Sequence, residues 1–203
     1  TAQLNIIEPT AVLAAISLDS NVSCNGGNNG AATASATGGT GAFTYSWNNG
    51  QTLASASGLA AGTYAVTVTD ANGCTDSASI TISEPTAITA STTITNNASC
   101  NGATDGSATL NASGGTMPYS YLWSNGQTSA NATGLAAGTY TVTLTDGNGC
   151  TSTSTAVITE PNAITLSFSS TNVSCNGGTN GSATATASDG TGTFNYAWSA
   201  SAG

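Results

Sequence analysis

The sequence contains no lysine, no arginine and no histidine. Nine aspartates and glutamates give it a formal net charge of -9 at pH 7. A chain without cations cannot neutralise the phosphates of nucleic acid, so nucleic acid is excluded as a partner. The absence of histidine removes the commonest metal ligand and general base, and the absence of lysine removes Schiff-base and isopeptide chemistry. These absences indicate that the protein is not an enzyme.

Long apolar runs are absent as well. The longest apolar stretch, Ala11–Ile16, is far shorter than the roughly 18 to 20 residues that a membrane helix needs, so we expect no direct membrane insertion. No basic segment followed by an apolar one stands at the start of the sequence, so we expect any export signal to lie outside it. Valine, isoleucine, tyrosine and tryptophan nevertheless recur in alternating runs, a pattern typical of folded β-structure and not of disorder.

What the sequence does contain is one unit copied about every 76 residues. The dipeptide Glu-Pro occurs at residues 8–9, 84–85 and 160–161, and the cysteines and tryptophans recur in nearly the same register. Each Glu-Pro pair closes a β-like run, and proline cannot donate to a sheet ladder, so we place the repeat boundaries there. The predicted domains are residues 1–9, the last strand of a preceding repeat; 10–85 and 86–161, two complete repeats; and 162–203, an incomplete third repeat.

Each repeat is predicted to contain six short strands and no helix, because alternating runs are separated by turn signals such as Asn-Gly. In the first repeat the runs cover residues 12–22, 31–37, 43–47, 52–57, 63–69 and 78–82. Trp47 on the third run and Tyr64 after the sequence GLAAG resemble the central tryptophan and the tyrosine corner of immunoglobulin-like domains. The predicted fold class is therefore all-β, with tandem immunoglobulin-like β-sandwich repeats of about 76 residues.

Disulfide bonds are expected, because a unit this small and rich in alanine and glycine buries little apolar surface. Six strands joined by reversals would place the turns of Cys24 and Cys74 at the same end of the sandwich. We therefore expect Cys24 to pair with Cys74, Cys100 with Cys150, and Cys175 with a cysteine beyond the sequence. Four cysteines permit three pairings, however, and a seventh strand would place the two turns at opposite ends. Cys24 would then pair with Cys150 of the next repeat.

A calcium site is a weaker candidate. Asp-x-Asn-Gly begins like a calcium-binding loop, but no distal glutamate follows, and the same residues suit a tight hairpin turn. The glutamate of each Glu-Pro pair would be the additional ligand, against the alternative of a solvated residue before proline. The candidate ligands are Asp70, Asn72, Asp146, Asn148, Glu84 and Glu160. No other metal and no cofactor is expected.

Two further surface features have competing interpretations. Phe43, Tyr45 and Trp47 could stack on a sugar, but their spacing places them on one strand face and favours a core position. Ser77, in the sequence Asp76-Ser77-Ala78, is a candidate for O-glycosylation that the second repeat lacks.

The repeated motifs identify a family resemblance. The sequences CNGGxNG, GGTxxxxYxW, GLAAGTYxVT, TDxNGC and a closing I(S/T)EP occur in this order in the first complete repeat, and the set resembles the SprB-type repeat of very large surface adhesins of gliding Bacteroidetes. The resemblance implies type IX secretion, an outer-membrane-associated extracellular location, and a role in adhesion and gliding motility. It supplies no catalytic residues.

The functional hypothesis is a stalk or filament segment of such an adhesin, in which the partners of each repeat are its neighbours in the same chain. A first alternative is a weak carbohydrate-binding module that gains avidity for surface polysaccharide by repetition. A second alternative is the subunit of a self-assembling extracellular filament, in which chains associate laterally.

Overall fold

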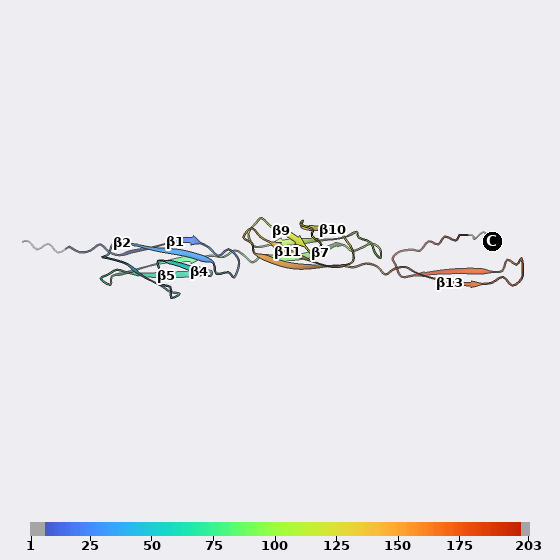
Figure 1. Cartoon of the computed structure of the whole chain (residues 1–203), viewed down its shortest axis with the longest axis horizontal. Coiled ribbons are helices and arrows are strands. Elements are labelled where there is room, and N and C mark those ends of the chain that lie inside the picture. Colours follow the sequence, from blue (N-terminus) through green and yellow to red (C-terminus); the bar gives the residue numbers. More distant parts are fainter. Residues whose placement is uncertain (1–6, 200–203) are drawn as a thin grey trace, which may run out of the picture. The chain divides into compact units, whose positions relative to one another are not determined.

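The computed structural model describes residues 7–199, in which all regular secondary structure is β-strand (Figure 1). The first repeat contains β1 (Leu13–Ser20), β2 (Gly30–Thr37), β3 (Thr44–Trp47), β4 (Ser55–Leu59), β5 (Gly62–Thr69) and β6 (Thr75–Ile82). The second contains β7 (Thr89–Asn96), β8 (Gly106–Ser113), β9 (Ser120–Trp123), β10 (Asn131–Leu135), β11 (Gly138–Thr145) and β12 (Thr151–Ile158). The third contains β13 (Thr165–Thr171) and β14 (Ser182–Ser188).

The prediction of six strands per complete repeat is confirmed. Most of the strand expected at residues 1–9 lies outside the described residues. The described residues form two compact units: one runs up to Thr89 and includes Ala112–Tyr119 and Thr145–Ser152, and the other holds the remaining residues. The Glu-Pro repeat boundaries stay a prediction. Within the described range no helix is long and apolar enough to span a membrane.

Each complete repeat forms two three-stranded antiparallel sheets. In the first repeat the strand orders are β1-β2-β4 and β3-β5-β6, and in the second they are β7-β8-β10 and β9-β11-β12. An immunoglobulin constant-type domain has sheets ABED and CFG, so these orders correspond to ABE and CFG without strand D. The immunoglobulin-like sandwich is thus confirmed by strand order.

Two signature side chains occupy the positions that this fold gives them. Trp47 on β3 is 2% exposed, and its indole N–H donates to the backbone carbonyl of Leu53 at 2.8 Å. The Tyr64 hydroxyl, at the start of β5, donates to the Ala60 carbonyl four residues upstream at 3.1 Å. The tryptophan and the tyrosine corner therefore have the roles that the sequence predicted.

The connection from β3 to β4 does not reverse the chain. Leu59, at the end of β4, pairs with Gly30 at the start of β2, close to the Cys24 loop. By contrast, Thr44 at the start of β3 pairs with Thr69 at the end of β5, close to the Cys74 turn. Both strands therefore run toward the Cys24 end, and the chain changes sheet between them. This is the consequence of losing strand D.

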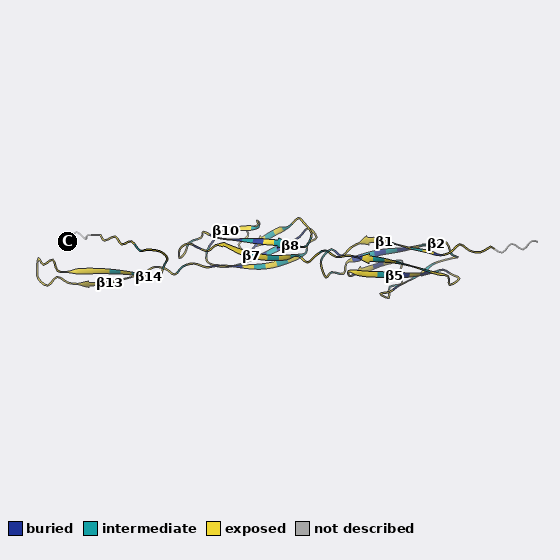
Figure 2. Cartoon of the chain, turned by 180° about the vertical axis from the view of Figure 1, so that it is seen from behind, coloured by how far each residue is buried: buried dark blue, intermediate teal, exposed yellow. Residues whose placement is uncertain are grey.

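The core lies between the two sheets. Alternate residues of the strands point inward and are buried, while those between them are exposed (Figure 2). In the first repeat the buried residues are Val12, Val22, Ala32, Ala34, Trp47, Ala56, Leu59, Val66, Val68 and Ile82. Phe43 and Tyr45 pack against them, so the aromatic cluster belongs to the core.

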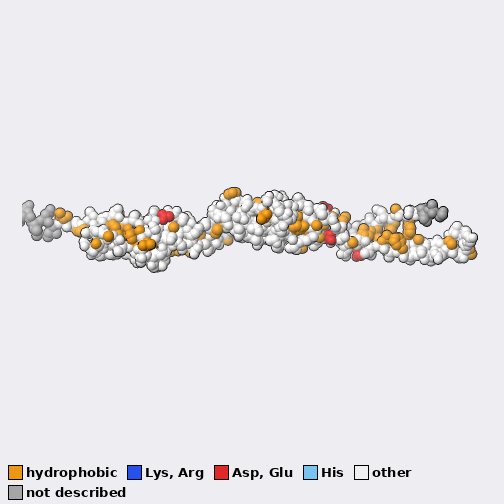
Figure 3. Space-filling view, viewed as in Figure 1, with side chains coloured by type: hydrophobic (Ala, Val, Ile, Leu, Met, Phe, Trp, Pro, Cys, Tyr) orange, Lys and Arg blue, Asp and Glu red, His pale blue; other side chains and the backbone are white. Residues whose placement is uncertain are grey.

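The third repeat presents the same apolar face without a second sheet over it. Phe168 on β13 is 69% exposed, and its ring meets Trp198 edge to face, with ring centroids 6.4 Å apart. Figure 3 shows hydrophobic side chains gathered over this hairpin. In the complete repeats the residues C-terminal to the aromatic run form the rest of the sandwich.

Replacing Trp47 by alanine is expected to lower the free energy of unfolding by about 3 to 5 kcal/mol, because it leaves a large cavity in a small core. The measurement is urea denaturation followed by circular dichroism. Leu53→Ala is the matched control: Leu53 is 73% exposed, and the variant keeps the carbonyl that the indole contacts. A Trp47 variant as stable as the Leu53 variant would contradict the core assignment.

Candidate functional site at the Cys24 to Cys150 disulfide

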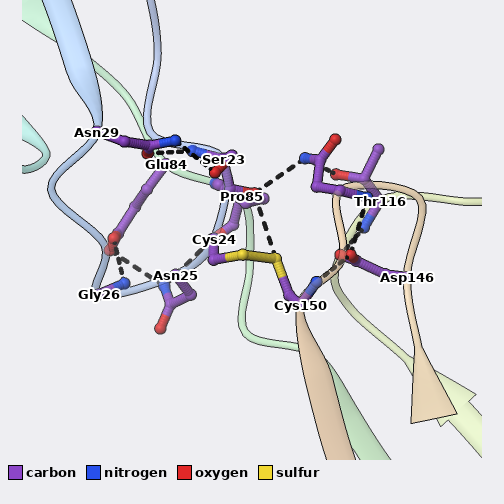
Figure 4. Close-up of a disulfide and its surroundings, with 11 residues drawn as sticks. Ser23, Cys24, Asn25, Gly26, Asn29, Glu84, Pro85, Thr116, Asp146 and Cys150 are labelled. Carbon is purple, nitrogen blue, oxygen red and sulfur yellow. Dashed lines mark hydrogen bonds between the residues drawn. A yellow bond between two sulfur atoms is a disulfide. The ribbon is translucent and has the colours of Figure 1, made fainter.

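A disulfide joins Cys24, in the loop after β1, to Cys150, which directly precedes the last strand of the second repeat (Figure 4). Their Cα atoms are 5.7 Å apart, and their sequence separation is 126. Cys74, Cys100 and Cys175 are free and exposed. The expected pairs Cys24–Cys74 and Cys100–Cys150 are therefore wrong, and the alternative pairing across repeats is the one observed.

The physical reason is the connection between β3 and β4. The expectation assumed that every connection between consecutive strands reverses the chain. Because this one does not, Cys24 and Cys74 lie at opposite ends of the first sandwich. Both members of the observed bond belong to the first compact unit, since the segment Thr145–Ser152 clusters with the first repeat.

The Cys24 loop is closed by its own side chains. The Ser23 amide donates to Oδ1 of Asn29 at 2.9 Å, and the Asn29 side-chain amide donates back to the Ser23 hydroxyl at 2.7 Å. The Gly27 amide donates to the Cys24 carbonyl at 2.9 Å, which makes a tight turn around the cysteine. Asp105 and Asn180 accept the same serine amide bond in the other copies, at 2.9 and 3.0 Å.

The glutamate of the Glu-Pro pair accepts hydrogen bonds from this loop. Gly26 donates its amide to Oε2 of Glu84 at 2.6 Å, and the Asn25 side chain donates to Oε1 at 3.1 Å. The Asn25 amide also reaches the carbonyl of Pro85 at 3.1 Å. Glu160 receives the same bonds from Gly102 and Asn101 in the second repeat, at 2.7 and 3.0 Å. Glu84 thereby ties the segment after β6 to the cysteine loop.

Asp146 organises the other side of the disulfide. Its Oδ1 accepts from the amides of Cys150 and Asn148, at 2.8 and 3.0 Å, and its Oδ2 accepts from the Thr116 amide at 2.8 Å. These backbone bonds, with that of Thr116 the strongest, hold the pKa of Asp146 below its usual value although burial acts against them. Asp146 is only 5% exposed, so in a chain without cations the backbone amides stabilise its charge.

One further contact joins the two sides, and another fixes the linker to the second repeat. The Asn148 side chain donates to the carbonyl of Ser23 at 2.9 Å, directly beside the disulfide. The Gly115 amide donates to the carbonyl of Thr86 at 2.9 Å. Gly114, at φ +69°, lies so close that a Cβ would meet the Ala87 carbonyl oxygen at 2.0 Å, so this position needs glycine. The linker is thus held both before and after its proline.

Asp70 repeats the arrangement in the first sandwich. Its carboxylate accepts from the amides of Cys74 at 2.8 Å, Thr40 at 2.8 Å and Asn72 at 2.9 Å. The bond from Cys74 is the largest of the causes that hold the pKa of Asp70 below its usual value. The Asp70 carboxylate, which the sequence made a calcium candidate, therefore accepts hydrogen bonds from the turn that presents Cys74.

The calcium candidates are not gathered into one site. Glu84 and Glu160 lie against the cysteine loops, whereas Asp70 and Asn72 belong to a hairpin at the opposite end of the first repeat. Among residues 7–199 no group of three or more His, Cys, Asp or Glu side chains could hold a metal ion. Calcium binding stays an untested prediction.

Sequence reasoning did not assign roles to Asn25, Asn148 and Thr116 in joining the repeats. Part of their signal was present, because Asn follows each first-loop cysteine and Thr follows the Gly-Gly after the second strand of both complete repeats. Ser77, the candidate for O-glycosylation, lies on β6 with its side chain exposed. Its modification stays a prediction.

These repeated sandwiches and the bond that joins them define the chain as a segment of tandem immunoglobulin-like repeats. A family model for the SprB repeat matches residues 20–52, 92–128 and 167–203, which together are just over half of the chain. The chain belongs to the SprB repeat family. It is therefore a repeat segment of the cell-surface adhesin type, and this membership is consistent with a structural, non-enzymatic protein.

No curated protein matches the chain. Among solved structures it is similar to a C-terminal 282-residue fragment of intimin, in complex with the intimin-binding domain of the translocated intimin receptor. The identity is 16%, the TM-score is 0.39, and the match covers 79% of this chain and 67% of that one. It is also similar to a tetra-tandem repeat in the extending region of a large adhesion protein, at 16% identity and TM-score 0.29, with 87% and 56% covered. At these scores the likenesses carry no argument.

Acid is expected to destabilise the fold through Asp70 and Asp146. Because their native pKa values lie below the unfolded value of about 3.9, their contribution is present above that pH and is lost as pH falls through the native pKa. The free energy of unfolding, measured in urea between pH 7 and pH 2, should therefore fall in the acid range.

The matched pair for this measurement is Asp70→Asn and Asp19→Asn. The Asp70 variant should lose stability near neutral pH and show a shallower decline in acid, since it lacks the titrating group. The Asp19 variant alters an exposed aspartate of β1 and should keep the full acid slope. Equal slopes in both variants and in the unmodified protein would refute the role assigned to the Asp70 turn.

Proposed function

We propose that this chain is a stalk or filament segment of a large secreted adhesin that acts in surface adhesion and gliding motility, with repeats bounded by Glu-Pro. The observation that carries the proposal is the disulfide from Cys24 to Cys150, which crosses from one repeat to the next. A disulfide that closes a loop of this length stabilises the folded state by about 5 kcal/mol in the chain-entropy model.

The bond also changes how the chain carries tension. A force applied to the two ends passes from Cys24 directly to Cys150 and bypasses the loop between them, which has a sequence separation of 126. Unfolding can then release length only from the residues outside this loop. A stalk that holds a binding region away from a cell needs this property, because each repeat that unravels would let the tip move out of position.

The junction contacts support the same role. Glu84 holds the linker to the Cys24 loop, the Gly115 amide holds the Thr86 carbonyl, and Asn148 bonds to Ser23. Repetition of the glutamate contacts at Glu160 indicates that the arrangement belongs to the repeat unit and not to one position. The proposal also includes export by the type IX route and an outer-membrane-associated location, because resemblance to the SprB repeat family implies both.

The carbohydrate-binding alternative gains no support from the aromatic cluster. Trp47 is buried, and Phe43 and Tyr45 pack against the core, so these side chains do not form a stacking surface for a sugar in the folded repeat. The second alternative, a self-assembling filament in which chains associate laterally, stays a prediction.

Single-molecule stretching of the oxidised chain from its two ends tests this role. Reduction should lengthen the fully unfolded chain by about 420 to 450 Å, which is 126 residues at 3.3 to 3.6 Å each. Cys24→Ser should show the longer contour without reductant, because it removes one partner of the bond.

Cys100→Ser is the matched control, since Cys100 occupies the same loop of the second repeat but is free. It should behave like the unmodified chain. No change on reduction would sink the proposed mechanical role. A change of only about 170 Å would mean a bond within one repeat, between cysteines 50 residues apart such as Cys24 and Cys74 or Cys100 and Cys150, and would also exclude it.

A further inference from the structure

The surroundings of the disulfide recur at both free cysteines of the complete repeats. A cavity of about 380 Å³ adjoins the bonded pair. It is lined by Cys24, Asn25, Pro85, Thr86, Ala87, Ile88, Gly115, Asp146, Gly149, Cys150 and Thr151. This cavity contains a first-loop cysteine from one repeat and a last-hairpin cysteine from the next.

A second cavity, of about 290 Å³, adjoins Cys100 in the other compact unit. Its lining is Cys100, Asn101, Pro161, Asn162, Ala163, Ile164, Gly190 and Thr191. Seven of these positions lie 75 or 76 residues after a position that lines the first cavity. The eighth, Thr191, corresponds to Thr116, whose amide donates to Asp146 of that lining. The positions that correspond to the last hairpin, namely Asp146, Gly149, Cys150 and Thr151, are missing from this set.

A third cavity, of about 310 Å³, adjoins Cys74. It is lined by Glu8, Pro9, Thr10, Ala11, Val12, Asp70, Cys74 and Thr75. Six of these positions lie 76 residues before Pro85, Thr86, Ala87, Ile88, Asp146 and Cys150, and Thr75 corresponds to Thr151. Here the last-hairpin cysteine is present, and the first-loop cysteine with its asparagine is missing.

Each half is already held as in the bonded junction. The Cys74 amide donates to Asp70 at 2.8 Å, the same distance as from Cys150 to Asp146. On the other side, Glu160 receives the Gly102 amide next to Cys100 at 2.7 Å, as Glu84 receives that of Gly26 at 2.6 Å. The two exposed thiols therefore stand in half-junctions that complement each other.

We propose that the cysteines form a forward relay, in which the first-loop cysteine of every repeat is bonded to the last-hairpin cysteine of the following repeat. Cys74 is then bonded to a preceding copy of the repeat, and Cys100 and Cys175 to following copies. The proposal rests on the proposed extracellular role, which supplies oxidising conditions. In each bond two thiols lose two protons and two electrons, and a small-molecule disulfide such as oxidised glutathione is reduced to two thiols.

The relay would limit how far an array can extend. From Cys150 the chain runs only 25 residues to Cys175, where the next bond of the same path begins. Every two repeats thus contribute about 80 to 90 Å of backbone to the tensioned path, against about 500 to 550 Å for two repeats without bonds. The other bonds form a second path of the same kind, offset by one repeat. An array joined in this way has two covalent paths along its length.

The test is a disulfide map of the full chain and of an extended chain in which a copy of residues 124–161 follows Trp198. Both are refolded in a mixture of oxidised and reduced glutathione, and free thiols are blocked. Cleavage after aspartate then places Cys24, Cys74 and Cys100 in separate peptides, and fragmentation of the peptide of residues 147–189 distinguishes Cys150 from Cys175. Mass spectrometry without reduction identifies the linked peptides.

The full chain should contain one bond, Cys24 to Cys150, and three blocked thiols. In the extended chain the peptides of Cys24 and Cys100 should each be linked to a Cys150-type peptide, with Cys74 and Cys175 blocked. Cys100→Ser in the extended chain should leave the added cysteine blocked and should not redirect it to Cys175.

A bond between Cys175 and the added cysteine would overturn the relay, because it joins two cysteines of one repeat. So would a blocked Cys100 in a folded extended chain. Either result could occur while the bond between Cys24 and Cys150 still shortens the stretched chain, so the relay and the proposed mechanical role fail separately.

Discussion

The passage of the chain from β3 to β4 without a reversal is the constraint on which the junction depends. In a sandwich whose strands all reversed in turn, the loop of Cys24 and the turn of Cys74 would share an end, and each repeat could close its own disulfide. Without strand D, the two strands run in the same direction on opposite sheets. The cysteines then lie at opposite ends, and a disulfide can form only where one repeat meets the next.

The second condition is the absence of cations. Asp70 and Asp146 are both nearly buried, and no lysine, arginine or histidine exists to pair with them. Their charges are stabilised by backbone amides, which come from the same hairpin and from the loop after the second strand of the sandwich. This solution has a structural benefit. The bonds that stabilise each carboxylate also fix the turn that carries the last-hairpin cysteine, so charge and cysteine position are set together.

The Glu-Pro pair likewise combines two structural roles at the linker. Proline ends the ladder, and the glutamate beside it accepts two hydrogen bonds from the cysteine loop. A residue that the sequence presents as a boundary marker is therefore a contact of the junction. Because every repeat carries both halves of this arrangement, a short unit with a modest core can be stabilised by its neighbours, as expected for tandem repeats whose stability depends on interfaces.

The sequence by itself determined the repeat, its six strands and the core side of each strand, because these follow from local periodicity and turn residues. Trp47 and Tyr64 were placed correctly for this reason, as were the turns at Asn-Gly. The partner of Cys24 was not determined, since it depends on whether the connection from β3 to β4 reverses the chain. No local sequence signal near residues 48–54 shows whether it does. Only the tertiary structure brought Cys150, Asn148 and Ser23 together, because contacts across more than a hundred residues follow from strand direction and sheet order.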